Sequence, residues 1–532
     1  MSNSVYQIFE NTCRDCAANP MLQLVSDTAQ QYGVAPKTFS YQEAADAIQH
    51  LIGAYRPLSL PVGARVALGL DNRPEFFFHW LALNALGISV VPLNPQWQTA
   101  ELEYVLSHSE SCLVVTLDER VQALKQVAVD IEVRSSEGEW LRHTAANIDL
   151  LPANLANECA LLYTSGTTGK PKGCMLSNEY FISTGRWYLE LGGYCALQPG
   201  QDRLITPLPM YHMNAMAVST MAMLMTGSCI VPLDRFHPTT WWQSIRECDA
   251  TIMHYLGVMP AMLMSLPPSE QDSSHNIRFG FGAGLSGELH TAFEKRFNMQ
   301  LIEAWAMTET GCTVAVMANK EPRKVGTACF GRPPAHLDYR LMDDNGNDVS
   351  VGQTGELLVR RVGGNPRYGF FSGYLKDETA TIEAWQGGYF HTGDLVYLDE
   401  DGLMHFVDRK KNVIRRSGEN ISAVEVEEIL MEHEAVNTVG VTAVPDSVRG
   451  DEVFACIVTP SNPSKTLAES IVQHCLSRLA YFKAPGYVTF VEALPLTATG
   501  KIQRAEDREW RRSSRNRALA GRGPRRSKSL PY

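Results

Sequence analysis

The sequence has no long apolar run and no excess of positive charge. Even its longer apolar stretches, such as AMAVSTMAMLM at 215–225, fall short of the roughly 20 residues that a transmembrane helix requires. Lys and Arg number 47 against 58 Asp and Glu, so the formal net charge is −11. The short apolar runs predict no transmembrane span. Nucleic-acid binders neutralise phosphates with clustered basic residues, so the negative net charge predicts no nucleic-acid partner.

The sequence also lacks a secretion signal and a second cysteine pair. Its start, MSNSVYQIFENTC, has neither the basic residues nor the apolar run of a signal peptide, and its twelve cysteines are scattered. These features predict a cytoplasmic protein. Cys13 and Cys16 form a single CxxC, which could be half a metal site or a redox pair. No other pair has ligand spacing, so we favour neither role.

Two regions of different texture follow one another along the 532 residues. Up to about residue 400, β-branched runs such as ARVALGL at 64–70 alternate with helical stretches such as FFFHWLALNALG at 76–87. This alternation is typical of α/β layers. Near Asp408 a charged stretch leads into VEVEEILMEH, a helix with early acidic residues, as the helix dipole favours.

This change of texture predicts an α/β fold in two parts. A large N-terminal domain of mostly parallel layered sheets with helices is expected over 1–408, and a small mobile α+β domain over 409–510. From residue 511 onward, eight of 22 residues are Lys or Arg among Ser, Gly and Pro. The segment 511–532 is therefore expected to be a disordered basic tail.

The most informative segment is LLYTSGTTGKPKGCMLSN at 161–178. An apolar run precedes small and hydroxylated residues from Thr164 to Gly169, and two lysines flank Pro171. Such a loop can bring backbone N–H groups, hydroxyls and ammonium charges onto phosphate oxygens. A Walker P-loop needs Gly where this chain has Thr164, and Ser or Thr where it has Pro171. The segment indicates a polyphosphate site of another kind.

This loop resembles the phosphate loop of the adenylate-forming superfamily, which contains acyl-CoA synthetases, firefly luciferases and peptide-synthetase adenylation domains. Four more segments resemble the superfamily's motifs in order: PLPMYHMNAM at 207–216, EAWAMTETG at 303–311, the region 388–429, and LPLTATGKIQR at 494–504. The resemblance covers about residues 20–510. It implies an ATP-dependent acyl-CoA ligase that forms acyl-AMP and pyrophosphate, then acyl-CoA and AMP. ATP, coenzyme A and a small carboxylic acid would be the reactants, and Mg²⁺ a cofactor.

The resemblance assigns ATP contacts to the phosphate loop, a glycine-rich turn, the adenine motif and a ribose-binding pair. These residues are Thr164, Ser165, Gly166, Thr167, Thr168, Gly169, Lys172, Gly282, Ala283, Gly284, Glu303, Ala304, Trp305, Ala306, Met307, Thr308, Asp394 and Arg409. Trp305 is expected to pack on adenine. The glycine-rich turn forms a GxGxxG with Gly287, which alone is a weak dinucleotide signal, so we assign it to ATP.

Catalysis is expected from Lys501, Thr164 and Glu309. Attack by a carboxylate on a polyanion meets repulsion, and one donor aimed at the developing charge is worth about 2.7–4 kcal/mol. Lys501 follows Gly in a TATGK turn, from which a mobile loop can deliver its ammonium group. Glu309 supplies the carboxylate that Mg²⁺ takes together with substrate phosphates. Asp394 can accept from ribose hydroxyls, and Arg409 offers a permanent charge to ribose or phosphate.

The acid pocket is expected to contain His212, Met213, Asn214, Gly257 and Val258. Its loop has no acidic residue to pair an α-ammonium group, so a free amino acid is disfavoured. The texture resembles the crotonobetaine/carnitine-CoA ligase-like branch, which implies carnitine or fatty acid metabolism. Methionine-rich segments suit adaptable apolar binding, so a short, medium, branched or ring-bearing acid stays open.

Three histidines need separate interpretations. His212 is expected to wall or gate the pocket in preference to acting as a general base. His254 and His391 have no partner pattern in the sequence, and we predict structural roles for both.

For thioester formation, the resemblance places a hinge at Lys411 and the coenzyme A path at Ser417, Gly418 and Glu419. Gly418 would let the pantetheine chain pass close to the backbone. Two alternatives stay open: a stand-alone adenylation enzyme that loads a carrier protein, and an inactive ATP-binding protein. The presence of Lys501 together with the predicted magnesium and ribose carboxylates disfavours the second. For assembly, a homodimer stays open as the commonest soluble oligomer.

Overall fold

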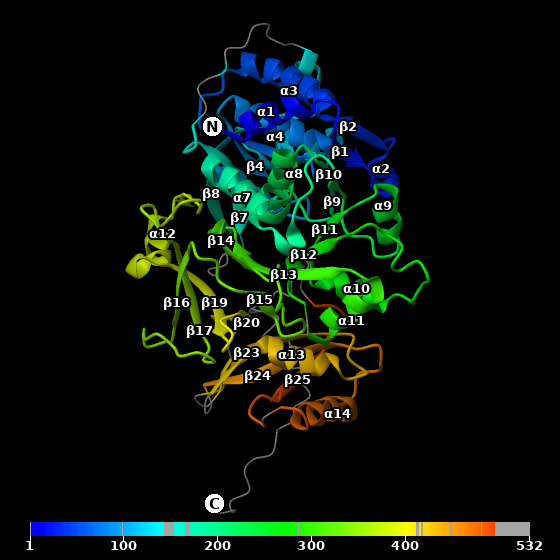
Figure 1. The fold of residues 1–532 in the computed structure, drawn as a ribbon, viewed down its shortest axis with the longest axis vertical. Coiled ribbons are helices and arrows are strands. Elements are labelled where there is room, and N and C mark those ends of the chain that lie inside the picture. The colour runs from blue at the N-terminus through cyan, green and yellow to red at the C-terminus, as the bar shows by residue number, and fades with distance from the viewer. Residues whose placement is uncertain are drawn as a thin grey trace, which may run out of the picture. The chain divides into compact units, whose positions relative to one another are not determined.

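The alternation of β-branched runs and helical stretches produces two large, mainly parallel sheets (Figure 1). The computed structural model describes residues 2–97, 99–142, 150, 154–164, 171–285, 287–410, 414–416, 419–446, 450–479 and 481–494. The basic segment 511–532 lies outside these residues. The predicted α/β class, with a large part built of layered sheets and helices and a smaller C-terminal part, is confirmed.

One sheet has seven strands in the order β18-β8-β7-β4-β3-β5-β6. Its strands are β3 (Arg65–Gly69), β4 (Ser89–Pro92), β5 (Ser111–Thr116), β6 (Glu132–Ser135), β7 (Glu158–Thr164), β8 (Lys172–Ser177) and β18 (Gly373–Tyr374). Strands β7, β4, β3, β5 and β6 run parallel. At one edge, β8 pairs antiparallel with β7, and β18 pairs antiparallel with β8. The central strands are almost wholly apolar, as expected of strands covered on both faces.

The other large sheet has eight strands in the order β14-β13-β12-β11-β9-β10-β1-β2. Its strands are β1 (Pro20–Leu24), β2 (Lys37–Ser40), β9 (Arg203–Thr206), β10 (Cys229–Pro232), β11 (Ile252–Leu256), β12 (Phe279–Ala283), β13 (Gln300–Met307) and β14 (Gly311–Met317). Strands β1, β10, β9, β11, β12 and β13 run parallel, and β2 and β14 are antiparallel edges.

Helices accompany these strands in the sequence. They are α1 (Val5–Cys16), α2 (Ser26–Tyr32), α3 (Tyr41–Tyr55), α4 (Pro74–Ala85), α5 (Thr99–Ser109), α6 (Val121–Val127), α7 (Asn178–Glu190), α8 (Thr220–Thr226), α9 (Trp241–Glu247), α10 (Val258–Ser265), α11 (Gly287–Phe297) and α12 (Glu378–Ala384). Helices α1, α3 and α4 pack against one another, and α7 packs on α8 (Figure 1). Helix α4 is mainly apolar around its circumference, and all its residues except Glu75 are buried. Helix α3 begins with a capping box between Ser40 and Glu43.

The chain divides into two compact units. The first contains residues up to Tyr339, Leu358–Thr392 and Asp401–Met404, and the second contains Arg340–Leu357, Gly393–Glu400 and the residues from His405 onward. A five-stranded sheet has its strands in the order β15-β20-β19-β17-β16. They are β15 (Cys329–Gly331), β16 (Leu337–Met342), β17 (Gly355–Arg361), β19 (Phe390–Leu398) and β20 (Met404–Arg409). The proposed boundary at residue 408 stays a prediction.

The second unit also contains a five-stranded, mainly antiparallel sheet with two helices. Its strands follow the order β22-β21-β24-β23, with β25 parallel to β24. They are β21 (Ile414–Arg416), β22 (Glu419–Ile421), β23 (Thr438–Asp446), β24 (Gly450–Val458) and β25 (Tyr487–Phe490), with helices α13 (Ala423–Met431) and α14 (Lys465–Leu476). Apolar residues of both helices and of these strands form one buried core. In the described part of the chain, no helix combines the length and apolarity needed to traverse a bilayer.

Candidate active site

Several predicted site residues follow the carboxyl ends of neighbouring parallel strands in the first unit. His212, Met213 and Asn214 come after β9, Gly257 after β11 and Gly284 after β12. Carboxyl ends of adjacent parallel strands share one edge of a sheet, where open α/β sheets bind their ligands. The topology therefore brings the predicted acid pocket and the predicted glycine-rich nucleotide turn to the same edge.

Two of these loops touch through their backbones. The Gly257 N–H donates to the carbonyl of Ala283 at 3.0 Å. A β-carbon added at Gly257 would overlap the carbonyl of Gly284, so the close approach requires glycine at that position. Gly284 has φ +89°, a left-handed conformation that also favours glycine. A predicted pocket residue thus directly supports the predicted glycine-rich turn at Gly282, Ala283 and Gly284, and we call residues 283–285, with which it overlaps, the nucleotide turn.

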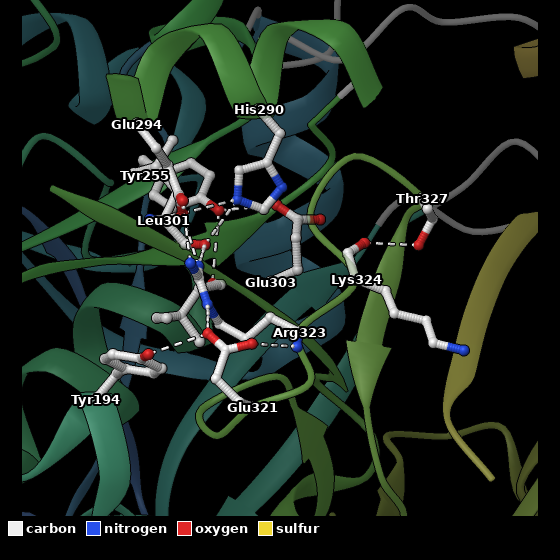
Figure 2. Close-up of polar contacts among 11 residues, drawn as sticks. Tyr194, Tyr255, His290, Glu294, Leu301, Glu303, Glu321, Arg323, Lys324 and Thr327 are labelled. Atoms are coloured by element: carbon white, nitrogen blue, oxygen red, sulfur yellow. Dashed lines mark hydrogen bonds and ion pairs between the residues drawn. The ribbon is translucent and has the colours of Figure 1, made fainter. Parts of the chain in front are cut away.

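Glu303, on β13, lies beneath this turn and is 7% exposed. One carboxylate oxygen accepts from the Tyr255 hydroxyl at 2.8 Å, and the other accepts from the backbone N–H of Gly284 at 3.0 Å. Figure 2 shows the Tyr255 and Glu303 side chains pointing toward one another. Burial raises the pKa of the Glu303 carboxyl, and the hydrogen bonds from Tyr255 and the turn oppose that rise.

A second polar cluster lies nearby and has no predicted site residue in it (Figure 2). Glu294 accepts from the Arg323 guanidinium at 2.6 and 3.0 Å and from the Leu301 N–H at 2.8 Å. His290 also contacts Glu294, at 3.2 Å. Burial by itself would raise the pKa of Glu294, but these partners together lower it to about 2. The cluster is a fully paired structural network that ties α11 to β13.

The predicted pocket loop leads into a π-helix at Asn214–Ser219. The Ser219 hydroxyl donates to the Asn214 carbonyl five residues earlier, which supports the wider turn. His254 is fully buried, with Nδ1 2.7 Å from the Asn214 side-chain oxygen and Nε2 3.1 Å from the Tyr188 hydroxyl. Burial lowers the pKa of His254 to about 3, so its ring stays neutral. His254 therefore positions a predicted pocket residue, a role that no pattern in the sequence indicated.

His212 and its neighbours are half-buried at the start of this segment. The Tyr211 and His212 rings lie 4.8 Å apart, and the His212 N–H donates to the Pro209 carbonyl. Tyr180 donates to the Met213 sulfur at 3.7 Å. Val258, the first residue of α10, is 43% exposed.

The two ends of the predicted phosphate loop lie on adjacent strands. Thr164 on β7 is the register partner of Lys172 on β8. The Thr164 hydroxyl is 3.9 Å from the Cys174 sulfur, and burial raises the pKa of that thiol, with Glu309 adding to the rise. Lys172 lies 5.0 Å above the Tyr374 ring and 3.4 Å from Asp377. The loop residues between them, 165–170, lie outside the described residues.

Glu309 is 8% exposed and belongs to the same group of contacts. It accepts from the Tyr374 hydroxyl at 3.0 Å. A hard carboxylate beside the ends of a phosphate loop fits what Mg²⁺ takes from proteins, one or two carboxylates together with substrate phosphates. The sequence reasoning missed Tyr374, since GYLKDET shows no pattern that marks it before its strand is known to pair with β8.

The predicted adenine motif occupies the end of β13 and the turn after it. Trp305 is 5% exposed, with its ring 6.5 Å from that of Phe330. Ala306 is exposed, and Ala304, Met307 and Thr308 are half-buried. The Met307 N–H donates to the Thr310 hydroxyl, which fixes the turn that leads to Glu309.

In the second unit, the predicted ribose pair forms an ion pair. Arg409 Nε lies 2.6 Å from a carboxylate oxygen of Asp394, whose side chain is 2% exposed, whereas that of Arg409 is 41% exposed. Beside it, Lys410 contacts Glu356 at 2.8 Å. His391, predicted to be structural, lies 3.2 Å from the Gln386 carbonyl.

Several predicted residues lie outside the described part of the chain. They are Ser165, Gly166, Thr167, Thr168, Gly169, Lys411, Ser417, Gly418 and Lys501. Glu419 begins β22 and is the register partner of Arg416. The roles assigned to all of these residues stay predictions.

Comparison with known proteins decides the family. A family model described as AMP-binding enzyme matches residues 21–375, and one described as AMP-binding enzyme C-terminal domain matches residues 425–501. The chain belongs to the AMP-binding enzyme family. The resemblance to adenylate-forming enzymes is thereby confirmed.

Curated proteins with the name of one kind of coenzyme A ligase match most of the chain. The crotonobetaine/carnitine-CoA ligase of Escherichia coli strain SE11 is 30% identical over 492 residues, which cover 88% of this chain and 92% of that protein. The ligase of the same name from Shigella sonnei strain Ss046 is 30% identical over 498 residues, with the same shares of each chain covered.

Solved structures share the fold. The o-succinylbenzoate coenzyme A synthetase of Bacillus subtilis, in complex with ATP and a magnesium ion, has a TM-score of 0.80 at 24% identity, covering 94% of this chain and 98% of that one. The ATP-bound MatB of Rhodopseudomonas palustris has a TM-score of 0.81 at 22% identity, with 94% and 97% covered.

Proposed function

We propose that this chain is an AMP-forming acid–thiol ligase. It converts a carboxylic acid and ATP into acyl-AMP and pyrophosphate, and then converts acyl-AMP and coenzyme A into acyl-CoA and AMP. The observation that carries the proposal is the group formed by Thr164, Lys172 and Glu309. In the first unit, both ends of a polyphosphate-type loop lie on paired strands, beside a carboxylate held by Tyr374.

In this proposal, each part of the site binds a different part of the nucleotide. The phosphate loop and Lys172 bind the phosphates, the nucleotide turn and Trp305 bind adenine, and Asp394 and Arg409 bind ribose. Glu309 would hold Mg²⁺, which neutralises phosphate charge when bound. The Tyr374 hydroxyl fixes the orientation of the Glu309 carboxylate, as outer partners of metal ligands generally do.

The first half-reaction is an in-line attack of a carboxylate oxygen on the α-phosphorus. A new O–P bond forms, and the bond to the bridging oxygen of pyrophosphate breaks. Lys172 and Lys501 supply positive charge against the repulsion between the two anions.

In the second half-reaction, the sulfur of coenzyme A attacks the acyl carbon, the thiol proton is lost, and AMP leaves with its new oxygen. We assign the path of the thiol to Ser417, Gly418 and Glu419 and the hinge to Lys411. All twelve cysteines lie among the described residues and form no disulfide, as suits a reducing compartment, so we place the reaction in the cytoplasm.

We propose that the pocket for the acid substrate is adaptable and mainly apolar. The names of the relatives make crotonobetaine and carnitine the first acids to test. The predicted pocket residues Met213 and Val258 are apolar, and none of the five predicted pocket residues is acidic. Short, medium, branched and ring-bearing acids complete the panel.

Pyrophosphate release across this panel, with and without coenzyme A, tests the proposal. We expect release that depends on the acid and is stimulated by coenzyme A. Pyrophosphate release that coenzyme A does not stimulate, combined with acyl transfer to a phosphopantetheinylated carrier protein, would favour a carrier-loading enzyme. ATP binding without pyrophosphate release for any acid would favour an inactive nucleotide-binding protein.

A further inference from the structure

Glu303 has the environment of a support for the nucleotide turn and not that of a ligand for ATP. We propose that Glu303 is a positioning residue, which fixes residues 283–285 in the shape that receives the adenine nucleotide. This inference rests on the proposed function, because it assumes that the turn binds ATP.

The Glu303 carboxylate already has hydrogen-bond partners in the protein. One oxygen accepts from Tyr255 at 2.8 Å and the other from the Gly284 N–H at 3.0 Å. The Leu285 N–H also contributes a hydrogen bond. The side chain is buried, whereas Ala283 and Gly284 above it are exposed. The nucleotide would therefore meet the turn, and Glu303 would act on the nucleotide through it.

At Ala283 and Gly284 the turn has no bulky side chain to hold its shape, whereas the Leu285 side chain after them is buried. Gly284 is in the left-handed region, where an unsupported glycine samples many conformations. Its N–H is tied to Glu303, and the neighbouring Ala283 carbonyl is tied to the Gly257 N–H. These two bonds hold the turn from opposite sides. Removing the Glu303 carboxylate deletes the bonds from the Gly284 and Leu285 N–H groups and leaves the bond between Ala283 and Gly257 in place.

Tyr255 and Glu303 act together on the turn. Tyr255 is fully buried, and its ring and carbonyl pack so closely on Gly282 that no β-carbon fits there. Gly282 is in turn the register partner of Glu303 on the next strand. The same tyrosine therefore fixes the base of the turn by packing and orients the carboxylate by its hydroxyl group.

The test compares three substitutions in the full chain by calorimetric titration with Mg²⁺ and ATP. Glu303→Leu leaves the Gly284 N–H and the Tyr255 hydroxyl without their acceptor, and we expect ATP binding to weaken roughly tenfold or more. Glu303→Gln keeps one oxygen for Gly284 and an amide that can donate to Tyr255, so it should bind within about threefold of wild type.

Glu294→Gln is the matched control, since it alters a buried carboxylate of the neighbouring cluster that does not bond the turn. We expect it to lower the unfolding temperature but to leave the dissociation constant for ATP within about twofold of wild type. The Michaelis constant for the acid, measured at saturating ATP, should stay nearly unchanged in all three variants.

The outcomes distinguish failure of the proposed function from failure of the positioning role of Glu303. Failure of the wild-type protein to bind ATP would overturn the proposed function itself. If wild type binds ATP and Glu303→Leu binds it equally well while folded, the positioning role is wrong. An equal loss of affinity in Glu294→Gln and Glu303→Leu would also overturn it, because general destabilisation would then explain the effect.

Discussion

Replacing Gly257 by Ala should disturb both substrates at once, because this residue is where the predicted acid pocket touches the nucleotide turn. Gly257 has φ −52° and ψ −26°, a helical conformation that alanine adopts readily. The change therefore introduces no backbone strain of its own. Its added β-carbon would lie 2.5 Å from the Gly284 carbonyl carbon and closer still to the oxygen. Neither backbone atom can rotate away, so the two loops must separate.

Overpacking of this kind typically costs about 1–3 kcal/mol. If the whole cost appears in substrate binding, the Michaelis constants for ATP and for the acid would rise by about fivefold to 150-fold. Gly364→Ala is the matched control, since a β-carbon there meets nothing within 4 Å. A thermal unfolding transition should first show that both variants are folded. Their activity is then assayed by pyrophosphate release. Michaelis constants in Gly257→Ala that match those of Gly364→Ala would refute the reasoning.

Three further predictions concern residues with distinct roles. Tyr374→Phe removes the hydroxyl that orients Glu309, so the Mg²⁺ concentration for half-maximal activity should rise about tenfold, and an unchanged Mg²⁺ titration would contradict that role. His254 takes up a proton when the chain unfolds but not while it is folded, because burial lowers its pKa to about 3; stability is therefore complete above about pH 6.5 and falls as the pH drops toward 3. His254→Gln should remove about 2 kcal/mol of the stability difference between pH 7 and pH 5, measured by urea unfolding, and an unaltered difference would mean that other groups cause it. Lys501→Ala should abolish adenylate formation but spare thioester formation from synthetic acyl-adenylate, whereas equal loss of both steps would contradict its assignment.

The ordered motifs predicted the class of the fold and the family. This was possible because each motif joins a local pattern to a local need: a loop of small residues for phosphates, or an apolar run for a buried parallel strand. ARVALGL became β3, and the runs on either side of the phosphate loop became the paired strands β7 and β8.

Contacts between motifs could not be predicted in this way. The hydrogen bond from Gly284 to Glu303 joins residues 19 positions apart in the chain, and the bond from Tyr374 to Glu309 joins residues 65 apart. Such pairings depend on strand order and on which side chains are buried together, which one sequence does not encode as a local pattern. For the same reason His254 showed no partner in the sequence, although it bonds Asn214 and Tyr188 in the core.

The transfer of a labelled oxygen tests the two-step account most directly. The enzyme would be incubated with ATP, coenzyme A and a carboxylic acid that the pyrophosphate assay has identified as a substrate. The acid carries ¹⁸O in its carboxylate, and the products are analysed by mass spectrometry. If the acid attacks the α-phosphorus, AMP must retain one labelled oxygen, pyrophosphate must carry none, and acyl-CoA must form in equal amount. Unlabelled AMP, or label in inorganic phosphate alongside ADP, would contradict the account.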